Sequence, residues 1–122
     1  MEKETFDYVA ERAKILSKAD TSTQVTKDAA TEWLNATAAD ASDAVVEEAT
    51  AKLLDTLEGR PTTIDGVIAF AEGPAVQLIG EEVAAQMLAA QKERKANGAK
   101  WCNCEACSAA TQILAKFGRI EL

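Results

Sequence analysis

Apolar residues recur at spacings of three and four along most of this chain, a period typical of amphipathic helices. In the first such stretch, residues 4–18, one helix face would carry Phe6, Val9, Ala13 and Leu16. No stretch of any length alternates apolar and polar residues in the way that a half-buried strand would. The pattern therefore predicts an all-α fold.

Residues that typically begin or end helices predict five further helices. Thr21 and Gln24 fit a capping box, in which the hydroxyl accepts a backbone N–H and the amide side chain reaches back. Asp40 or Ser42 is expected to cap the third helix, because short polar side chains satisfy the first N–H groups. The six expected helices cover about residues 4–18, 21–36, 40–58, 63–72, 75–96 and 103–117.

The second and fifth helices each carry an apolar stripe that is expected to face the core. In the second helix the stripe begins at Val25 and includes Trp33. The fifth helix is the longest, and Gly80 within it either lets another helix approach closely or is simply a tolerated interior glycine. Its expected inner face consists of Val76, Ile79, Val83, Met87 and Ala90.

The chain has 122 residues, the size of one ordinary domain. We expect a single domain over residues 1–122, a compact bundle of five or six antiparallel helices, since short loops favour antiparallel neighbours. A cluster of cysteines stands at the start of the last helix.

The net charge of the chain makes some classes of binding partner less favourable. The formal net charge is -7, and a free-standing nucleic-acid binder of this size would usually be basic. No apolar run approaches the ~18 residues that a membrane span needs. The first residues mix charged and apolar side chains, unlike a secretory signal. We therefore expect a cytoplasmic protein that binds neither nucleic acid nor membrane, with a protein partner or a homodimer as alternatives.

All three cysteines, Cys102, Cys104 and Cys107, fall within six residues. Thiolates are ligands for soft metals, and residues three apart share one side of a helix. The cluster is therefore a candidate site for zinc or an iron–sulfur cluster, with Glu105 as a candidate fourth ligand. If a second chain must complete the coordination, the protein would be a homodimer whose stability depends on metal.

Other side chains around the cysteines are candidates for supporting roles. Lys95 and Lys100 would offset the charge of bound thiolates. With Trp101 and Glu105 they are candidates for the rim of a pocket or an interface, because tryptophan is enriched at such surfaces.

Two other interpretations of the cysteines stay open. Cys104 and Cys107 form a C-x-x-C pair at a helix N-terminus, where the dipole stabilises a thiolate for disulfide exchange. Alternatively, the cysteines only pack as small apolar side chains, and the acidic helices serve as a scaffold for a basic partner.

The C-x-x-C pair and the alanine-rich helix after it, Cys104 to Gly118, resemble the helical peroxidase-reductase and carboxymuconolactone decarboxylase-like domains. The resemblance implies a helical fold with thiol chemistry. Such enzymes carry a histidine one turn after the second cysteine, where this chain has Thr111. The chain contains no histidine, so the family's proton relay lacks its central group, and membership is not inferred.

The absence of histidine also excludes Ser-His-Asp and Cys-His arrangements within one chain. The chain has no glycine-rich phosphate loop of either common spacing. The sequence therefore favours a small binding or accessory protein over a stand-alone enzyme, with the thiolate cluster as its active feature.

Overall fold

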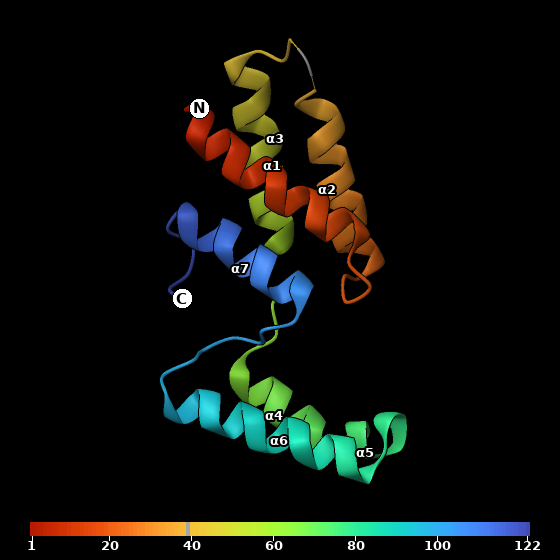
Figure 1. The fold of residues 1–122 in the computed structure, drawn as a ribbon. Helices are drawn as coiled ribbons and strands as arrows, with labels where there is room; N and C mark the ends of the chain where they lie inside the picture. The colour runs from red at the N-terminus through yellow and green to blue at the C-terminus, as the bar shows by residue number, and fades with distance from the viewer. Residues whose placement is uncertain (39) are drawn as a thin grey trace. The chain divides into compact units, whose positions relative to one another are not determined.

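A computed structural model of the chain describes residues 1–38 and 40–122. Within these residues it contains α-helices and no strand, which confirms the all-α prediction (Figure 1). The described residues form seven helices, so the predicted number of five or six is wrong. The helices are α1 (Lys3–Lys18), α2 (Gln24–Ala36), α3 (Asp43–Leu57), α4 (Ile64–Glu72), α5 (Pro74–Ile79), α6 (Glu81–Ala96) and α7 (Glu105–Lys116).

The additional helix arises at Gly80, where the predicted helix over residues 75–96 is interrupted. Gly80 has φ 90° and ψ 156°, a backbone conformation that is essentially restricted to glycine. It ends α5 and begins α6, so the residues on its two sides do not share one helix face. Interior glycines are usually tolerated within a helix, and here the glycine breaks the helix.

Helix starts follow the predicted chemistry at some positions and depart from it at others. Ser42 caps α3 as expected, with its Oγ accepting from the N–H of Val45 at 3.2 Å. Thr23, rather than Thr21, caps α2 and accepts from the N–H of Thr26 at 3.3 Å. The predicted capping box is therefore wrong, because the Thr21 hydroxyl serves a different helix, α7.

The described chain forms two compact units. The first consists of Met1–Pro61 and Asn103–Glu121, and carries α1, α2, α3 and α7. The second consists of Thr62–Cys102, with Leu122, and carries α4, α5 and α6. The second unit is thus inserted in the chain between α3 and α7 of the first.

The core of the first unit is centred on Trp33, whose side chain is 2% exposed. The indole N–H donates to Oγ1 of Thr50 at 3.0 Å, which joins α2 to α3. The ring of Phe6 on α1 lies 5.3 Å from that of Trp33, centroid to centroid. Helix α1 packs on α2 and α7, and α2 packs on α3 (Figure 1).

The inner face of α2 is shifted by one residue from the predicted stripe. Thr26, Ala30 and Trp33 are buried, whereas Val25 is 48% exposed. Thr26 is buried because its hydroxyl accepts from Oγ1 of the cap residue Thr23 at 3.1 Å. A polar side chain with a local partner can take an inward position that periodicity alone would give to valine.

The second unit has a small core built largely of alanine. Helix α4 packs along α6, and α5 contacts both. Its buried apolar residues are Ile64, Val67, Ala71, Ala75 and Ala84. The predicted inner face of the long helix is wrong at four of its five positions, since Val76, Ile79, Val83 and Ala90 are exposed.

A short backbone pairing closes the second unit. The N–H of Ile64 donates to the carbonyl of Lys100 at 2.9 Å, and the N–H of Cys102 donates to the carbonyl of Thr62 at 2.8 Å. Between these bonds Thr63 and Trp101 form an antiparallel bridge. The segment that leads to the cysteines is therefore held against the start of α4.

Among the described residues, no helix combines the length and the apolar character needed to cross a bilayer.

Replacing Gly80 with alanine is expected to destabilise the second unit by about 1–3 kcal/mol, because a Cβ is strained at this backbone conformation. Gln77→Ala, on the exposed surface of α5, is the matched control and should leave the midpoint of urea unfolding unchanged. If Gly80→Ala raises the helical circular dichroism without lowering that midpoint, the interruption between α5 and α6 is not a required feature.

Replacing Thr50 with valine leaves the buried indole N–H of Trp33 without its acceptor, and is expected to lower the free energy of unfolding by about 1–3 kcal/mol. Thr56→Val is the control. The hydroxyls of Thr50 and Thr56 each donate to the backbone carbonyl four residues earlier, but Thr56 is more exposed and accepts no indole N–H. Equal losses in the two variants, measured by chemical denaturation, would show that the indole bond contributes nothing.

Candidate metal centre

The three predicted cysteines come together in space. The Sγ atoms of Cys102, Cys104 and Cys107 all lie within 4.8 Å of one another. All three side chains are partly buried. Among the described residues this is the group of histidine, cysteine and acidic side chains whose ligand atoms are close enough to hold one metal ion.

Backbone bonds hold the chain around Cys102. Its own N–H donates to the carbonyl of Thr62, as described above. The carbonyl of the preceding residue, Trp101, accepts from Nη2 of Arg94 at 2.9 Å, and Nη1 of Arg94 donates to Oε1 of Gln91 at 2.7 Å. The guanidinium therefore joins α6 to the segment that carries the first thiol.

Cys104 is positioned as the N-cap of α7. Its backbone is extended, with φ -64° and ψ 161°, the conformation that serine and threonine caps adopt elsewhere in this chain. The Sγ atom accepts a hydrogen bond from the N–H of Cys107 at 3.3 Å. The sulfur thus takes the place of the usual cap oxygen, and it faces the positive end of the helix dipole.

The first turn of α7 fixes Cys107. The N–H of Ala106 donates to Oγ1 of Thr21 at 3.0 Å, so a side chain from the loop before α2 satisfies a second N–H of this turn. The carbonyl of Cys107 accepts from Oγ1 of Thr111 at 2.8 Å. Ala106 and Ala110 are buried on the inner side of α7. The packing of this helix therefore sets the positions of Cys107 and of the N-cap residue Cys104.

The arrangement is compatible with a soft metal ion. Zinc binds thiolate sulfur at about 2.3 Å, which places two sulfurs of a tetrahedral site about 3.8 Å apart. The three Sγ atoms lie within 4.8 Å of one another, an upper bound that this value satisfies. The sequence holds three cysteines and no histidine, so a fourth ligand would have to be a carboxylate, water or a group from a second chain.

Comparison of the chain with protein-family models, with curated proteins and with solved structures finds no match. The candidate site therefore rests on the chemistry of the residues themselves.

The other predicted site residues do not join the cysteines in one group. Glu105 is exposed at the first position of α7, and its carboxylate lies outside the cluster. Nζ of Lys95 pairs with Oδ1 of Asp65 at 2.6 Å, which joins α6 to α4. Lys100 is exposed and Trp101 is partly buried. Their proposed roles toward the metal remain predictions.

Three residues that the sequence did not nominate position the thiols: Thr21, Thr62 and Arg94. Thr62 acts through its backbone carbonyl. Every residue has such a carbonyl, so the contact cannot be predicted from the residue type. Arg94 lies in the last turn of α6, where a cation is favourable for the helix dipole alone, so its residue type does not indicate a further role. Only the structure shows that its guanidinium is used by the carbonyl of Trp101.

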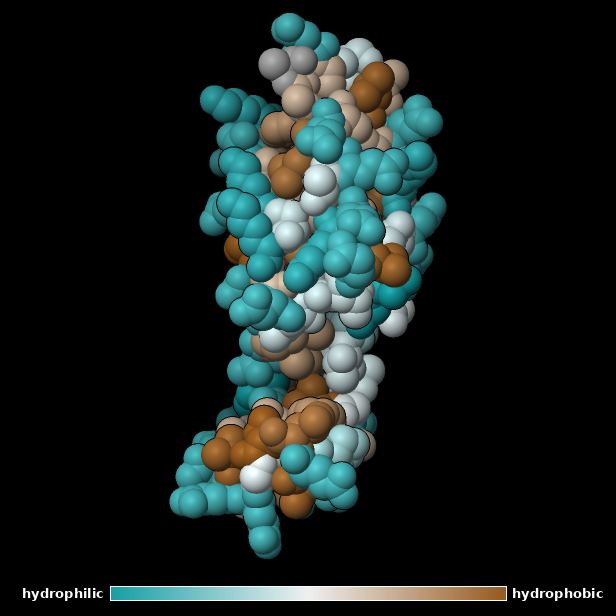
Figure 2. All heavy atoms as spheres, turned by 90° about the vertical axis from the view of Figure 1, so that its right-hand side faces the viewer, coloured by the Kyte–Doolittle hydropathy of each residue, from teal (hydrophilic) through white to brown (hydrophobic). Residues whose placement is uncertain are grey.

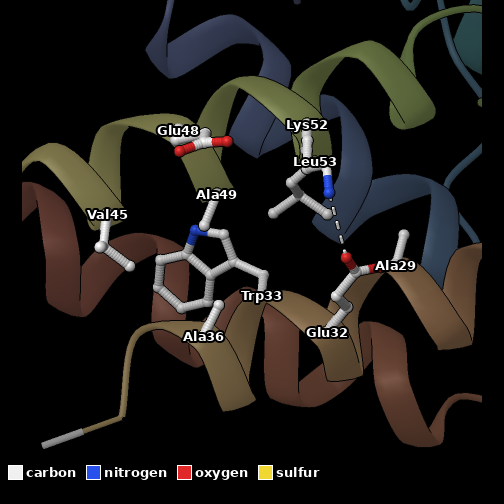
Figure 3. Close-up of a pocket in the computed structure, with 9 residues that line it drawn as sticks. All are labelled: Ala29, Glu32, Trp33, Ala36, Val45, Glu48, Ala49, Lys52 and Leu53. Atoms are coloured by element: carbon white, nitrogen blue, oxygen red, sulfur yellow. Dashed lines mark hydrogen bonds and ion pairs between the residues drawn. The ribbon is translucent and has the colours of Figure 1, made fainter. Parts of the chain in front are cut away.

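A second concave site lies between α2 and α3 in the first unit (Figure 3). It is a groove of about 230 Å³ whose walls carry the methyl groups of three alanines and of Val45. Lys52 pairs with Glu32 across its rim at 3.4 Å. The indole N–H of Trp33 is already bonded to Thr50, so it does not serve the groove. Alanines and an exposed ion pair offer little to orient a ligand, and the thiol cluster is the better candidate.

The cap role of Cys104 can be separated from its thiol chemistry. Cys104→Ser should preserve the stability of α7, because a serine oxygen is a preferred cap, whereas Cys104→Ala should be less stable by about 1 kcal/mol. Thermal unfolding of both metal-free variants checks this difference. Identical stabilities would mean that the Cys104 sulfur does not act as a cap.

Proposed function

We propose that this protein holds a single soft metal ion, zinc in the first instance, through Cys102, Cys104 and Cys107. The observation that carries the proposal is the proximity of the three Sγ atoms, all within 4.8 Å. Independent backbone contacts and a helix cap direct the thiols to this place. Three thiolates without histidine make a soft ligand set.

The incomplete ligand set favours an exchangeable ion over a structural one. Structural zinc sites are closed by four protein ligands, and a site with three keeps one position open. Cys102 and Cys104 are only partly buried, so a donor or acceptor molecule can reach the site through them. A site of this kind is suited to carrying an ion and releasing it by ligand exchange, and the accessory role predicted from the sequence agrees with that use.

Groups close to the cluster could offset the negative charge of thiolates bound to a metal ion. Cys104 lies at the positive end of the α7 dipole and accepts a backbone N–H. Bound to Zn²⁺, three thiolates would leave one net negative charge. Lys100, two residues before Cys102, is an exposed cation proposed to offset it.

Elemental analysis and metal titration test the proposal. Protein purified untagged and without oxygen should contain about one zinc per chain, or bind one Co²⁺ with a thiolate-to-metal absorption band. Zinc should also raise the unfolding temperature, because it binds the folded chain. Affinity should fall as the pH is lowered, because protons compete with the metal for the thiolates.

The matched variants separate metal loss from unfolding. Cys104→Ser retains the cap and should lose the metal band while the metal-free fold keeps its stability. Thr111→Val removes a hydroxyl next to Cys107 without removing sulfur, and should retain the band. A chain that carries no metal after anaerobic purification and shows no band with excess Co²⁺ would rule the proposal out.

A second candidate function is disulfide exchange by Cys104 and Cys107, which the hydrogen bond to the Cys104 sulfur also supports. The Cys104 thiolate would attack a substrate disulfide and release one substrate thiolate. Cys107 would then displace the second substrate thiol, so that the protein gains a disulfide as the substrate disulfide is reduced. A cellular dithiol would have to restore the two thiols. Metal-free protein that reduces a model disulfide, and loses this activity in Cys104→Ser, would favour this function over metal binding.

A further inference from the structure

The second unit carries most of the exposed large apolar side chains of the described chain. Eight such residues are at least partly exposed, and five of them lie between residues 70 and 83. We refer to these five as the α5 face, and their exposed fractions run from 38% to 71%. They are Phe70, Val76, Leu78, Ile79 and Val83.

The α5 face is contiguous because of the way the chain turns. Gly73 separates α4 from α5 and Gly80 separates α5 from α6, so the C-terminal end of α4, all of α5 and the first turn of α6 meet at one end of the unit (Figure 1). Figure 2 shows apolar side chains gathered in one area over this unit. Within α5 only Ala75 is buried, so this helix directs its larger side chains outward.

The charge around the α5 face has a single sign. Residues 61–91 contain Asp65, Glu72, Glu81 and Glu82 and no lysine or arginine, a formal charge of -4. Asp65 is compensated by Lys95. The other three acids are exposed and form no ion pair within the part of the chain that the structure describes. The apolar surface is therefore bordered by uncompensated carboxylates.

Two of the three exposed acids stand where a helix dipole stabilises them, since Glu81 and Glu82 lie in the first turn of α6. Glu72 ends α4 and directly precedes Gly73, the N-cap of α5, so the dipoles of the two helices act on it in opposite senses. None of these three acids pairs with a cation of the described residues, and a cation of a partner would compensate them.

We propose that the α5 face binds an amphipathic helix of a partner protein, with apolar residues on one side and lysine or arginine along the edges. The apolar contacts would supply the affinity, as in other helix recognition by hydrophobic surfaces. The carboxylates of Glu72, Glu81 and Glu82 would select a basic partner and accelerate its association. This inference does not depend on the metal proposal, because it uses none of the residues around the thiols.

The same charges disfavour the two other occupants of an apolar face. In a symmetric dimer each patch meets its own copy, so the acidic borders would approach one another. An anionic lipid surface would repel the same carboxylates. A basic helix is the partner that satisfies both the apolar side chains and the charge.

Binding of a synthetic leucine–lysine amphipathic peptide to the full chain tests the proposal, with fluorescence anisotropy as the readout. Leu78→Ser combined with Val83→Ser should weaken binding by about tenfold or more. The control is Val25→Ser in the first unit, a valine of similar exposure, which should leave binding unchanged. Equal binding by all variants, or no binding by the unaltered chain, would overturn the proposal.

The acidic border is tested with a second matched pair. Glu81→Gln with Glu82→Gln should weaken binding and reduce its dependence on salt. Glu47→Gln with Glu48→Gln makes the same charge change on the exposed surface of α3 and should have no such effect. A leucine–glutamate peptide that binds as well as the lysine peptide would contradict the assigned charge.

The two other occupants have their own readouts. Sedimentation of the unaltered chain would reveal a dimer that Leu78→Ser with Val83→Ser dissociates. Flotation with vesicles of phosphatidylserine and phosphatidylcholine would reveal lipid binding through the same residues. Either result would overturn the proposal in favour of a second copy or a membrane surface. A monomeric chain that does not float and that binds the basic peptide through the α5 face supports it.

Discussion

The backbone pairing between the start of α4 and the segment after α6 is the contact on which the candidate site depends. Two hydrogen bonds, from Ile64 to Lys100 and from Cys102 to Thr62, bring together the two ends of the segment Thr62–Cys102. Closing such a loop costs entropy that grows only slowly with its length, and the packing of α4 on α6 offsets it. With this closure in place, Cys102 is fixed a few residues before the cap of α7, and local helix geometry places the other two thiols.

The two units use apolar residues in different ways. In the first, the large side chains point inward, and Trp33 is buried with its N–H satisfied by Thr50. In the second, alanines fill much of the interior while Leu78 and Val83 face outward. Helices α4 and α6 pack on each other through this small core. The larger apolar residues of this unit then contribute to its surface, where they are available to a partner.

Much of the helical content could be predicted from apolar spacing, because four of the expected helices bury a face at the expected period. The cap at Ser42 and the proximity of the cysteines also follow from local chemistry, which residue types report directly. Other features depend on distant groups. Thr21 does not cap α2, because its oxygen is used by the N–H of Ala106, far along the chain. The break at Gly80 could not be predicted either, because a glycine within an apolar stripe is compatible with both a continuous helix and a break.

In the candidate metal site, too, some positions follow from local sequence and others depend on residues distant in the chain. The spacing of Cys104 and Cys107 on one helix turn is sufficient to predict that their sulfurs lie on one side. The contribution of Arg94 was not predictable, because the basic residues before the cysteines all have the same explanation as cations near a helix end. Its guanidinium reaches the carbonyl of Trp101 only because α6 and the following segment turn back toward each other.

The insertion of α4–α6 between α3 and α7 has a consequence for how such a chain can change over generations. Because the inserted stretch leaves and rejoins the surrounding chain at paired positions, Thr62 and Cys102, its length and content can vary while the path of the flanking helices stays the same. Exchange of whole segments is tolerated best where the ends of the segment lie close together. The exposed apolar surface of the inserted unit and the helices that hold Trp33 can therefore diverge at separate rates, within one gene.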